Sequence, residues 1–221
     1  MRQAFAGTIS VILLRTVPSL WLGLFSWNEE VGRMRIFISG GCKNGKSSHA
    51  QRLAKQQCAP GKPLYYLATM IPKDTEDRER IWRHRWERAG LGFETVEVSG
   101  SLRPVIKEWL DPAGSVLLDS VTALLSDGMF TAGGRVDMEA HVHLKHELLA
   151  LLEACPNVVL VSDGIYSDAW RYRPLTEAYR QRLAWLDCEL TKACDVVLEA
   201  AFGNLAVFKG NLLGEGWHAD R

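Results

Sequence analysis

The amino-acid sequence predicts an α/β fold, with a mostly parallel sheet of about seven strands and helices on both faces. Short apolar runs alternate with helical patterns from residue 34 onward, which is the order of elements that builds a parallel sheet. Most of these runs are continuously apolar, as expected of strands that are covered on both sides. The first run is followed by a glycine-rich turn and then by a helical pattern.

Seven segments have the character of strands. They are, in chain order, 34–39, 63–69, 93–98, 115–119, 157–162, 195–200 and 205–210. The helical patterns lie at 47–57, 75–89, 101–110, 138–154 and 173–193. The connection between the last two strands contains Phe202, Gly203 and Asn204, a short glycine-containing stretch that suits a hairpin.

Residues 1–33 differ from the rest of the chain. Their apolar runs are interrupted by Arg15 and Pro18, and neither run approaches the ~20 residues that span a bilayer. We interpret 1–33 as a non-catalytic N-terminal extension, with Met34 as the working start of one nucleotide-binding domain, 34–221. A weak signal peptide or a membrane-associating leader remains the alternative.

Composition narrows the class of protein. The chain has 221 residues, of which 47% are hydrophobic, enough for one sizeable core. Lys plus Arg (26) equals Asp plus Glu (26), so no overall positive charge favours nucleic acid. The five cysteines form no CxxC pair, which indicates a reduced, cytoplasmic protein without a disulfide framework or zinc ribbon.

A phosphate-binding loop follows the first predicted strand. Gly40, Gly45, Lys46 and Ser47 satisfy the pattern G-x-x-x-x-G-K-[ST], with a strand before it and a helix after it. Glycines let backbone N–H groups approach phosphate oxygens, the lysine adds a positive charge, and the serine hydroxyl can bind Mg²⁺. A glycine-rich turn without function is the less favoured interpretation.

The magnesium ion also needs an acidic partner. Asp119 closes the strand 115–119 and is the first candidate, together with Ser47. Asp163, which follows the strand 157–162, is a weaker candidate. Strand-end aspartates also serve as plain helix caps.

The helical segment 75–89 carries a histidine between two arginines. Arg80, His84 and Arg88 share one face, while Trp82 and Trp86 lie nearly opposite, and we interpret these tryptophans as core anchors. Neighbouring cations lower the pKa of a histidine and keep its imidazole neutral and nucleophilic. On spacing alone, a charged surface with an incidental histidine remains the alternative.

Four stretches occur in the order of a known family: ISGGCKNGKSSHA, YYLAT, DTEDRERIWRHRWERAGLGFETVE and VLLDSVTALLSD. The first is similar to the family's GGxxSGKSxxAE, and the third to its acidic-to-RIxxHRxxR segment with a trailing T-x-E. From Met34 to Gly210 the chain therefore resembles the bifunctional adenosylcobinamide kinase / adenosylcobinamide-phosphate guanylyltransferase family of cobalamin biosynthesis. The resemblance implies a P-loop NTPase-like fold and a homotrimer.

The resemblance also implies two reactions: phosphorylation of adenosylcobinamide, then transfer of GMP from GTP to the product through a guanylyl-histidine. His84 matches the guanylylated histidine, and Lys46 of the phosphate-binding loop is the second predicted catalytic residue. Ser47 and Asp119 would bind Mg²⁺, and GTP or ATP would be a substrate alongside the corrinoid. The implied nucleotide contacts are Gly40, Gly41, Cys42, Lys43, Asn44, Gly45, Lys46, Ser47, Ala68, Thr69, Arg85, Trp86, Glu87, Arg88, Glu97 and Asp119.

The chain departs from the family pattern after its fifth strand. The family usually has an Asn-Glu-Val-Gly-like turn there, whereas this chain has SDGIYSD, with Gly164 at the position of the glutamate. Asp127 replaces the asparagine that typically closes the Asp119 segment, and CKN replaces the usual interior of the loop. Two alternatives therefore stay open: another small-molecule P-loop kinase, and a single-activity or non-catalytic nucleotide-binding relative.

Overall fold

The computed structural model describes residues 34–70, 88–98, 100–131 and 133–212, together with the single residues 75, 79, 82, 85 and 86. The predicted extension, 1–33, and His84 lie outside these residues.

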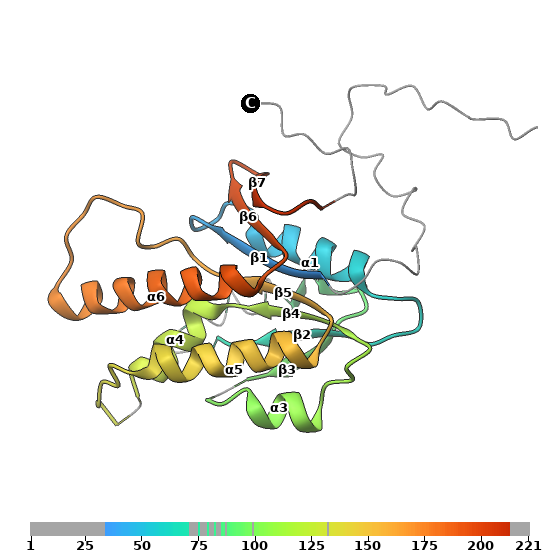
Figure 1. Cartoon of the computed structure of the whole chain (residues 1–221), viewed down its shortest axis with the longest axis horizontal. Coiled ribbons are helices and arrows are strands. Elements are labelled where there is room, and N and C mark those ends of the chain that lie inside the picture. Colours follow the sequence, from blue (N-terminus) through green and yellow to red (C-terminus); the bar gives the residue numbers. More distant parts are fainter. Residues whose placement is uncertain are drawn as a thin grey trace, which may run out of the picture.

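One seven-stranded sheet organises the described chain (Figure 1). Its strands lie in the order β3-β2-β4-β5-β1-β6-β7. All neighbouring pairs are parallel except β6 and β7, which form the antiparallel hairpin expected at the end of the chain. The α/β prediction is confirmed. The strands are β1 (Met34–Gly40), β2 (Leu64–Ala68), β3 (Glu94–Glu97), β4 (Ser115–Asp119), β5 (Asn157–Val161), β6 (Val196–Ala201) and β7 (Asn204–Lys209).

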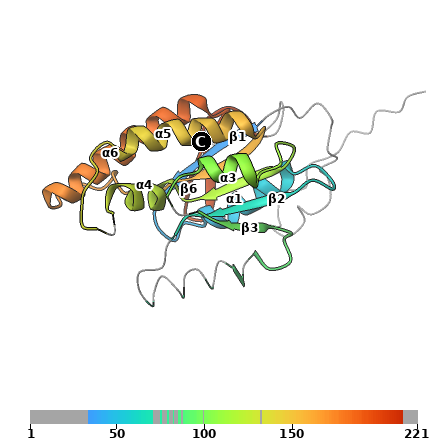
Figure 2. The same cartoon turned by 90° about the horizontal axis from the view of Figure 1, so that it is seen from below.

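Helices cover both faces of the sheet (Figures 1 and 2). Successive residues of a strand point to opposite faces, so Ile36 and Ile38 pack with α1, whereas Phe37 belongs to the core under α4, α5 and α6. The helices are α1 (Lys46–Gln57), α3 (Arg103–Glu108), α4 (Val121–Met129), α5 (Ala140–Ala154) and α6 (Pro174–Ala193). Residues 75, 79, 82, 85, 86 and 88 also have helical backbone.

Helix α4 is absent from the sequence prediction. Its apolar residues follow β4 after one residue, so they look like a continuation of the same buried run. The signal that separates them is Ser120, whose hydroxyl accepts a hydrogen bond from the N–H of Ala123 at 3.2 Å. That contact is a helix N-cap, and it fixes the turn from strand to helix directly beside Asp119.

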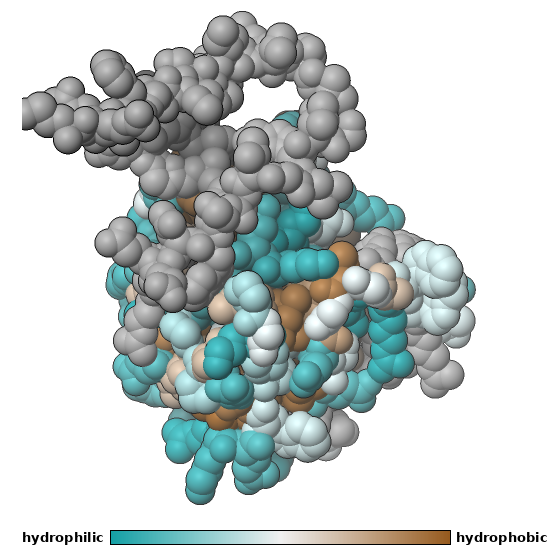
Figure 3. Space-filling view, turned by 90° about the vertical axis from the view of Figure 1, so that its right-hand side faces the viewer, coloured by the Kyte–Doolittle hydropathy of each residue, from teal (hydrophilic) through white to brown (hydrophobic). Residues whose placement is uncertain are grey.

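The described helices include none that is both long and apolar enough to cross a membrane. On the face seen in Figure 3 the described surface is mainly hydrophilic, with hydrophobic areas that are small and scattered.

Candidate nucleotide-binding site

The predicted phosphate loop, Asp119 and Asp163 meet at one edge of the sheet. Strands β4, β5 and β1 are consecutive neighbours and run parallel, so the residues that follow their carboxyl ends come together. In parallel sheets this edge is the usual place for a ligand. The site therefore depends on the strand order, which joins segments more than a hundred residues apart in the sequence.

The loop has the backbone conformation of an anion-binding turn. Gly40, Lys43 and Gly45 have φ values of 145°, 60° and 84°, in the region that residues other than glycine avoid. Gly45 precedes α1 as its N-cap, without a side-chain cap, so the first N–H groups of the helix remain for a ligand. The left-handed Lys43 is strained, a feature that concentrates at functional sites.

Lys46 is buried beneath this loop. Its side chain is 7% exposed, and its Nζ donates to the carbonyl of Gly41 at 2.6 Å. The same Nζ lies 2.9 Å from Oδ1 of Asp163. The backbone N–H of Asp163 donates to the hydroxyl of Thr122 at 2.8 Å, which ties the end of β5 to α4. Asp163 is therefore the carboxylate partner of Lys46.

Asp119 lies on the other side of the site. Its Oδ2 accepts hydrogen bonds from the hydroxyls of Ser47 and Tyr66, both at 2.9 Å. Magnesium binds oxygen at 2.0–2.1 Å with octahedral geometry, so two adjacent ligands on one ion are about 3 Å apart. The spacing of the Ser47 and Asp119 oxygens fits that requirement. Sequence reasoning did not single out Tyr66, because one tyrosine in a strand gives no local signal.

Two further predicted contacts, Ala68 and Thr69, lie beside Asp119 at the end of β2. Ala68 pairs with Asp119 on one side and with Glu97 on the other. The hydroxyl of Thr69 is buried, donates to the carbonyl of Ser120 at 2.9 Å, and accepts from its N–H at 2.6 Å. Thr69 thus fixes the backbone after Asp119, and its contact with a nucleotide stays a prediction.

A hollow of ≈ 600 Å³ opens beside Arg85 and Arg88. Arg85 pairs with Glu97 across it, and the guanidinium of Arg88 lies 3.5 Å from the centre of the Tyr66 ring. Arg88 is almost fully buried. The Tyr66 side chain therefore lies between the hollow and Asp119: its ring contacts Arg88 and its hydroxyl donates to Asp119. The hollow is lined by Arg85, Arg88, Ala89, Gly90, Gly92, Phe93, Thr95 and Glu97.

The interpretation of Trp82 and Trp86 as core anchors is wrong for this chain. They are 67% and 70% exposed, and their rings stack on each other with centres 6.1 Å apart. The physical reason is that Arg88, on another face of the same segment, takes the place against the sheet by packing on Tyr66. The predicted catalytic residue His84 and the predicted nucleotide contact Glu87 lie outside the described residues.

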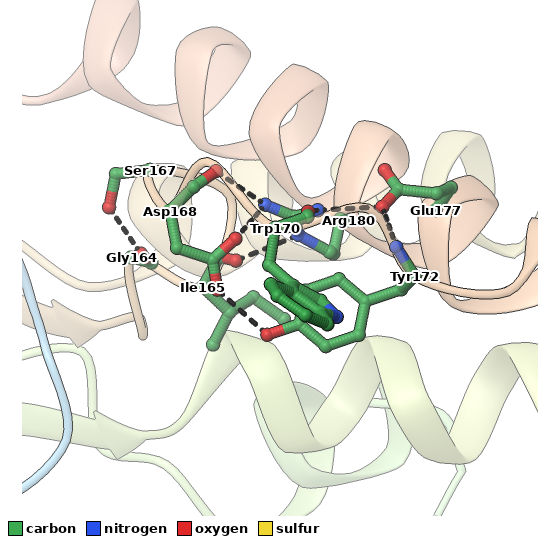
Figure 4. Close-up of polar contacts among 8 residues, drawn as sticks. All are labelled: Gly164, Ile165, Ser167, Asp168, Trp170, Tyr172, Glu177 and Arg180. Atoms are coloured by element: carbon green, nitrogen blue, oxygen red, sulfur yellow. Dashed lines mark hydrogen bonds and ion pairs between the residues drawn. The ribbon is translucent and has the colours of Figure 1, made fainter.

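A buried arginine holds the loop that departs from the family pattern (Figure 4). Arg180 of α6 donates to the carbonyls of Ile165, Asp168 and Trp170 and pairs with the carboxylates of Asp168 and Glu177. The loop after β5 is thereby fixed to α6. Sequence reasoning missed this role. The available signal was a charged residue three positions before Leu183, in line with the buried stripe of the helix.

Asp187, two helical turns after Arg180 on α6, supports the base of the same loop. It is 2% exposed, and its Oδ2 accepts hydrogen bonds from Ser162 at 2.8 Å and Tyr166 at 3.0 Å. Burial raises the pKa of this carboxyl to about 7, against the opposing effect of the two hydroxyls.

The sheet order and the loop geometry define a P-loop nucleotide-binding protein. A family model narrows this class: the one described as cobinamide kinase / cobinamide phosphate guanyltransferase matches residues 36–207. The chain belongs to this family.

Individual relatives agree with that assignment. The bifunctional adenosylcobalamin biosynthesis protein CobU of Escherichia coli strain K12 is 32% identical over 168 residues, which cover 68% of this chain and 90% of that protein. The protein of the same name from Salmonella typhimurium is 31% identical with the same coverage. The bifunctional adenosylcobalamin biosynthesis protein CobP of Pseudomonas aeruginosa is 28% identical and covers 81% of this chain and 100% of its own length.

Solved structures give weaker likenesses. The ATPase domain of G40P has a TM-score of 0.45 at 12% identity and covers 79% of both chains. The flagellar accessory protein FlaH from Methanocaldococcus jannaschii has a TM-score of 0.43 at 13% identity, covering 81% of this chain and 79% of its own.

Proposed function

We propose that this chain is a cobalamin biosynthesis enzyme that phosphorylates adenosylcobinamide and then transfers GMP from GTP to adenosylcobinamide phosphate. The observation that carries the proposal is the convergence of Lys46, Ser47 and Asp119 at one edge of the sheet, in a chain that belongs to this family. The phosphates of the nucleotide would lie in the loop 40–47, with Mg²⁺ on the oxygens of Ser47 and Asp119. The ion supplies positive charge where the phosphoryl oxygens gain negative charge.

In the kinase step, the substrate hydroxyl oxygen would form a bond to the γ-phosphorus while the bond to the β–γ bridging oxygen breaks. A general base accepts the hydroxyl proton, and a carboxylate can serve as one. Gly164 offers none, but Asp163 is adjacent in the chain and lies at the site, 2.9 Å from Lys46. We therefore propose Asp163 as the base that accepts the hydroxyl proton in the kinase step, with either ATP or GTP as the phosphate donor.

In the guanylyltransferase step, a ring nitrogen of His84 would form a bond to the α-phosphorus of GTP, and pyrophosphate would leave. The phosphate oxygen of adenosylcobinamide phosphate would then displace the histidine and give adenosylcobinamide-GDP. Splitting one transfer into two easier ones is nucleophilic catalysis. Arg85 and Arg88 belong to the same segment as His84 and lie next to the hollow beside Tyr66, where their charge suits a phosphate.

The covalent intermediate gives the direct test. Protein incubated with Mg²⁺ and α-³²P-GTP, then denatured, should carry acid-labile, base-stable label that maps to His84. The label should vanish in His84→Ala and persist in His143→Ala, a matched control on the exposed side of α5. Absence of label in protein that binds GTP would reject the guanylyltransferase assignment.

The kinase step is tested separately with adenosylcobinamide and ATP or GTP. Asp163→Asn should remove most phosphorylation and leave the labelling of His84 intact. If His84→Ala keeps full turnover while Lys46→Ala abolishes it, the chain is a plain P-loop kinase. Nucleotide binding without turnover of any corrinoid would instead identify a binding protein.

We further propose a cytoplasmic homotrimer, on the resemblance described above. Light scattering should then give about three times the chain mass of 24.7 kDa; a monomeric mass would reject it.

A further inference from the structure

The turn between β6 and β7 presents an aromatic side chain to solvent. Phe202 is 95% exposed and has a φ of 52°, in the left-handed region that costs a residue with a side chain about 1–2 kcal/mol. Glycine would occupy this position without that cost. With so much of its surface exposed, the Phe202 side chain gains almost no burial to offset this strain, so its surroundings are informative.

The turn lies against the phosphate loop. Nε2 of His49, on the first turn of α1, is 3.0 Å from the carbonyl oxygen of Gly203. A Cβ built on Gly45 would lie 4.0 Å from the Cα of Gly203, and one on Gly40 would lie 2.4 Å from the carbonyl oxygen of Ala200. The backbone on both sides of Phe202 is therefore in close contact with the loop or its helix.

The contact between His49 and the turn is well defined. A carbonyl oxygen accepts, so Nε2 must carry the proton, and Nδ1 is then free to accept from Nη2 of Arg52 at 2.7 Å. This arrangement needs a neutral ring. Asn204 adds a hydrogen bond from its side-chain amide to the carbonyl of Phe202 at 3.1 Å.

The direction of a bound nucleotide follows from the sheet order. Asp119, which suits the metal, and Asp163, the partner of Lys46, follow β4 and β5, on one side of β1. With the metal and Lys46 on that side, the nucleoside end of the chain of phosphates would leave the loop on the other side of β1. The next strand there is β6, and its carboxyl end leads into Phe202.

We propose that Phe202 is a stacking platform for the nucleobase of the nucleotide whose phosphates occupy the loop 40–47. The proposal rests on the proposed nucleotide site and adds the binding position of the base. Every nucleobase has a π-face that stacks on an aromatic ring, so the platform serves adenine and guanine alike. It accounts for an exposed aromatic residue on a turn that His49 and Asn204 hold in place.

The test compares ligands with and without a base. Dissociation constants are measured with Mg²⁺ for GTP, ATP and inorganic tripolyphosphate, on the wild-type chain, Phe202→Ala, Phe202→Trp and Phe208→Ala. Phe208 is the matched control, because it lies on β7 of the same hairpin and is 70% exposed. Stacking on one aromatic ring corresponds to about 5- to 150-fold in affinity.

We expect Phe202→Ala to weaken GTP and ATP by a factor in that range and to leave tripolyphosphate unchanged. Phe202→Trp and Phe208→Ala should bind all three ligands like the wild type. Equal weakening of all three ligands by Phe202→Ala, or none, would overturn the proposal. A change in oligomeric mass with unchanged GTP affinity would assign Phe202 to a protein interface instead. Failure of the wild type to bind any of the ligands would reject the nucleotide site itself, which is a different result.

Discussion

Gly40 is the last residue of β1 and the first of the phosphate loop, and both its close packing and its positive φ require a residue without a side chain. A Cβ added there would lie 2.4 Å from the carbonyl oxygen of Ala200, whereas real Cβ contacts stay at or above 3.0 Å. In Gly40→Ala, β1 and β6 must therefore move apart at the end of their shared ladder. The φ of 145° adds backbone strain of roughly 1–3 kcal/mol, and each ladder hydrogen bond that is lost costs about 1 kcal/mol more. We expect the free energy of unfolding to fall by about 3 kcal/mol or more.

Urea unfolding, followed by tryptophan fluorescence, measures this loss, and two controls separate its causes. Gly61→Ala has a φ of 73° with nothing within 4 Å of the new Cβ, so it should cost only the strain, about 1–2 kcal/mol. Gly164→Ala would place its Cβ 3.5 Å from the Ser39 hydroxyl, an ordinary contact, and should stay within about 0.5 kcal/mol of the wild type. If Gly40→Ala is no less stable than Gly61→Ala, the contact with Ala200 does not limit this position.

Three further results are expected. Lys46→Ala should weaken nucleotide binding at least 100-fold by calorimetry, as expected for the loss of a charge-assisted contact of about 3 kcal/mol. Lys43→Ala is the control: its side chain is exposed, so this variant should lose less than tenfold in nucleotide affinity. For the pH dependence, the native state keeps a proton on Asp187 from pH 3.8 to about pH 7 that the unfolded state releases. The free energy of unfolding should therefore fall by a few kcal/mol as pH rises through that window; Asp187→Asn should abolish this slope, and an unchanged slope would contradict the assignment. MgGTP should slow the alkylation of the exposed thiol of Cys42 in the loop. It should not slow the alkylation of Cys188, which is exposed on α6. Equal rates at Cys42 with and without nucleotide would place the phosphates elsewhere.

The local chemistry of the site could be predicted from the sequence. The pattern from Gly40 to Ser47 specifies its own conformation, because it places glycines where φ is positive and starts a helix at Lys46. The apolar runs predict the strands for a similar reason, since a strand buried on both faces needs continuous apolar residues. The order of a run, a turn and a helix is thus recorded within about twenty residues.

Only the tertiary structure showed that Asp163 pairs with Lys46 and that Tyr66 joins Ser47 at Asp119. Asp119 and Asp163 look alike in the sequence, each at the end of an apolar strand. The strand order then places Asp119 against Ser47 and Tyr66, and Asp163 against Lys46. Trp82 and Trp86 are a second case, because a helical pattern alone cannot assign them to the core or the surface. The packing of Arg88 on Tyr66 decides which residues lie against the sheet, and the two tryptophans are exposed. Sequence patterns extend over a few neighbouring residues, whereas these contacts join segments that meet only when the sheet has formed.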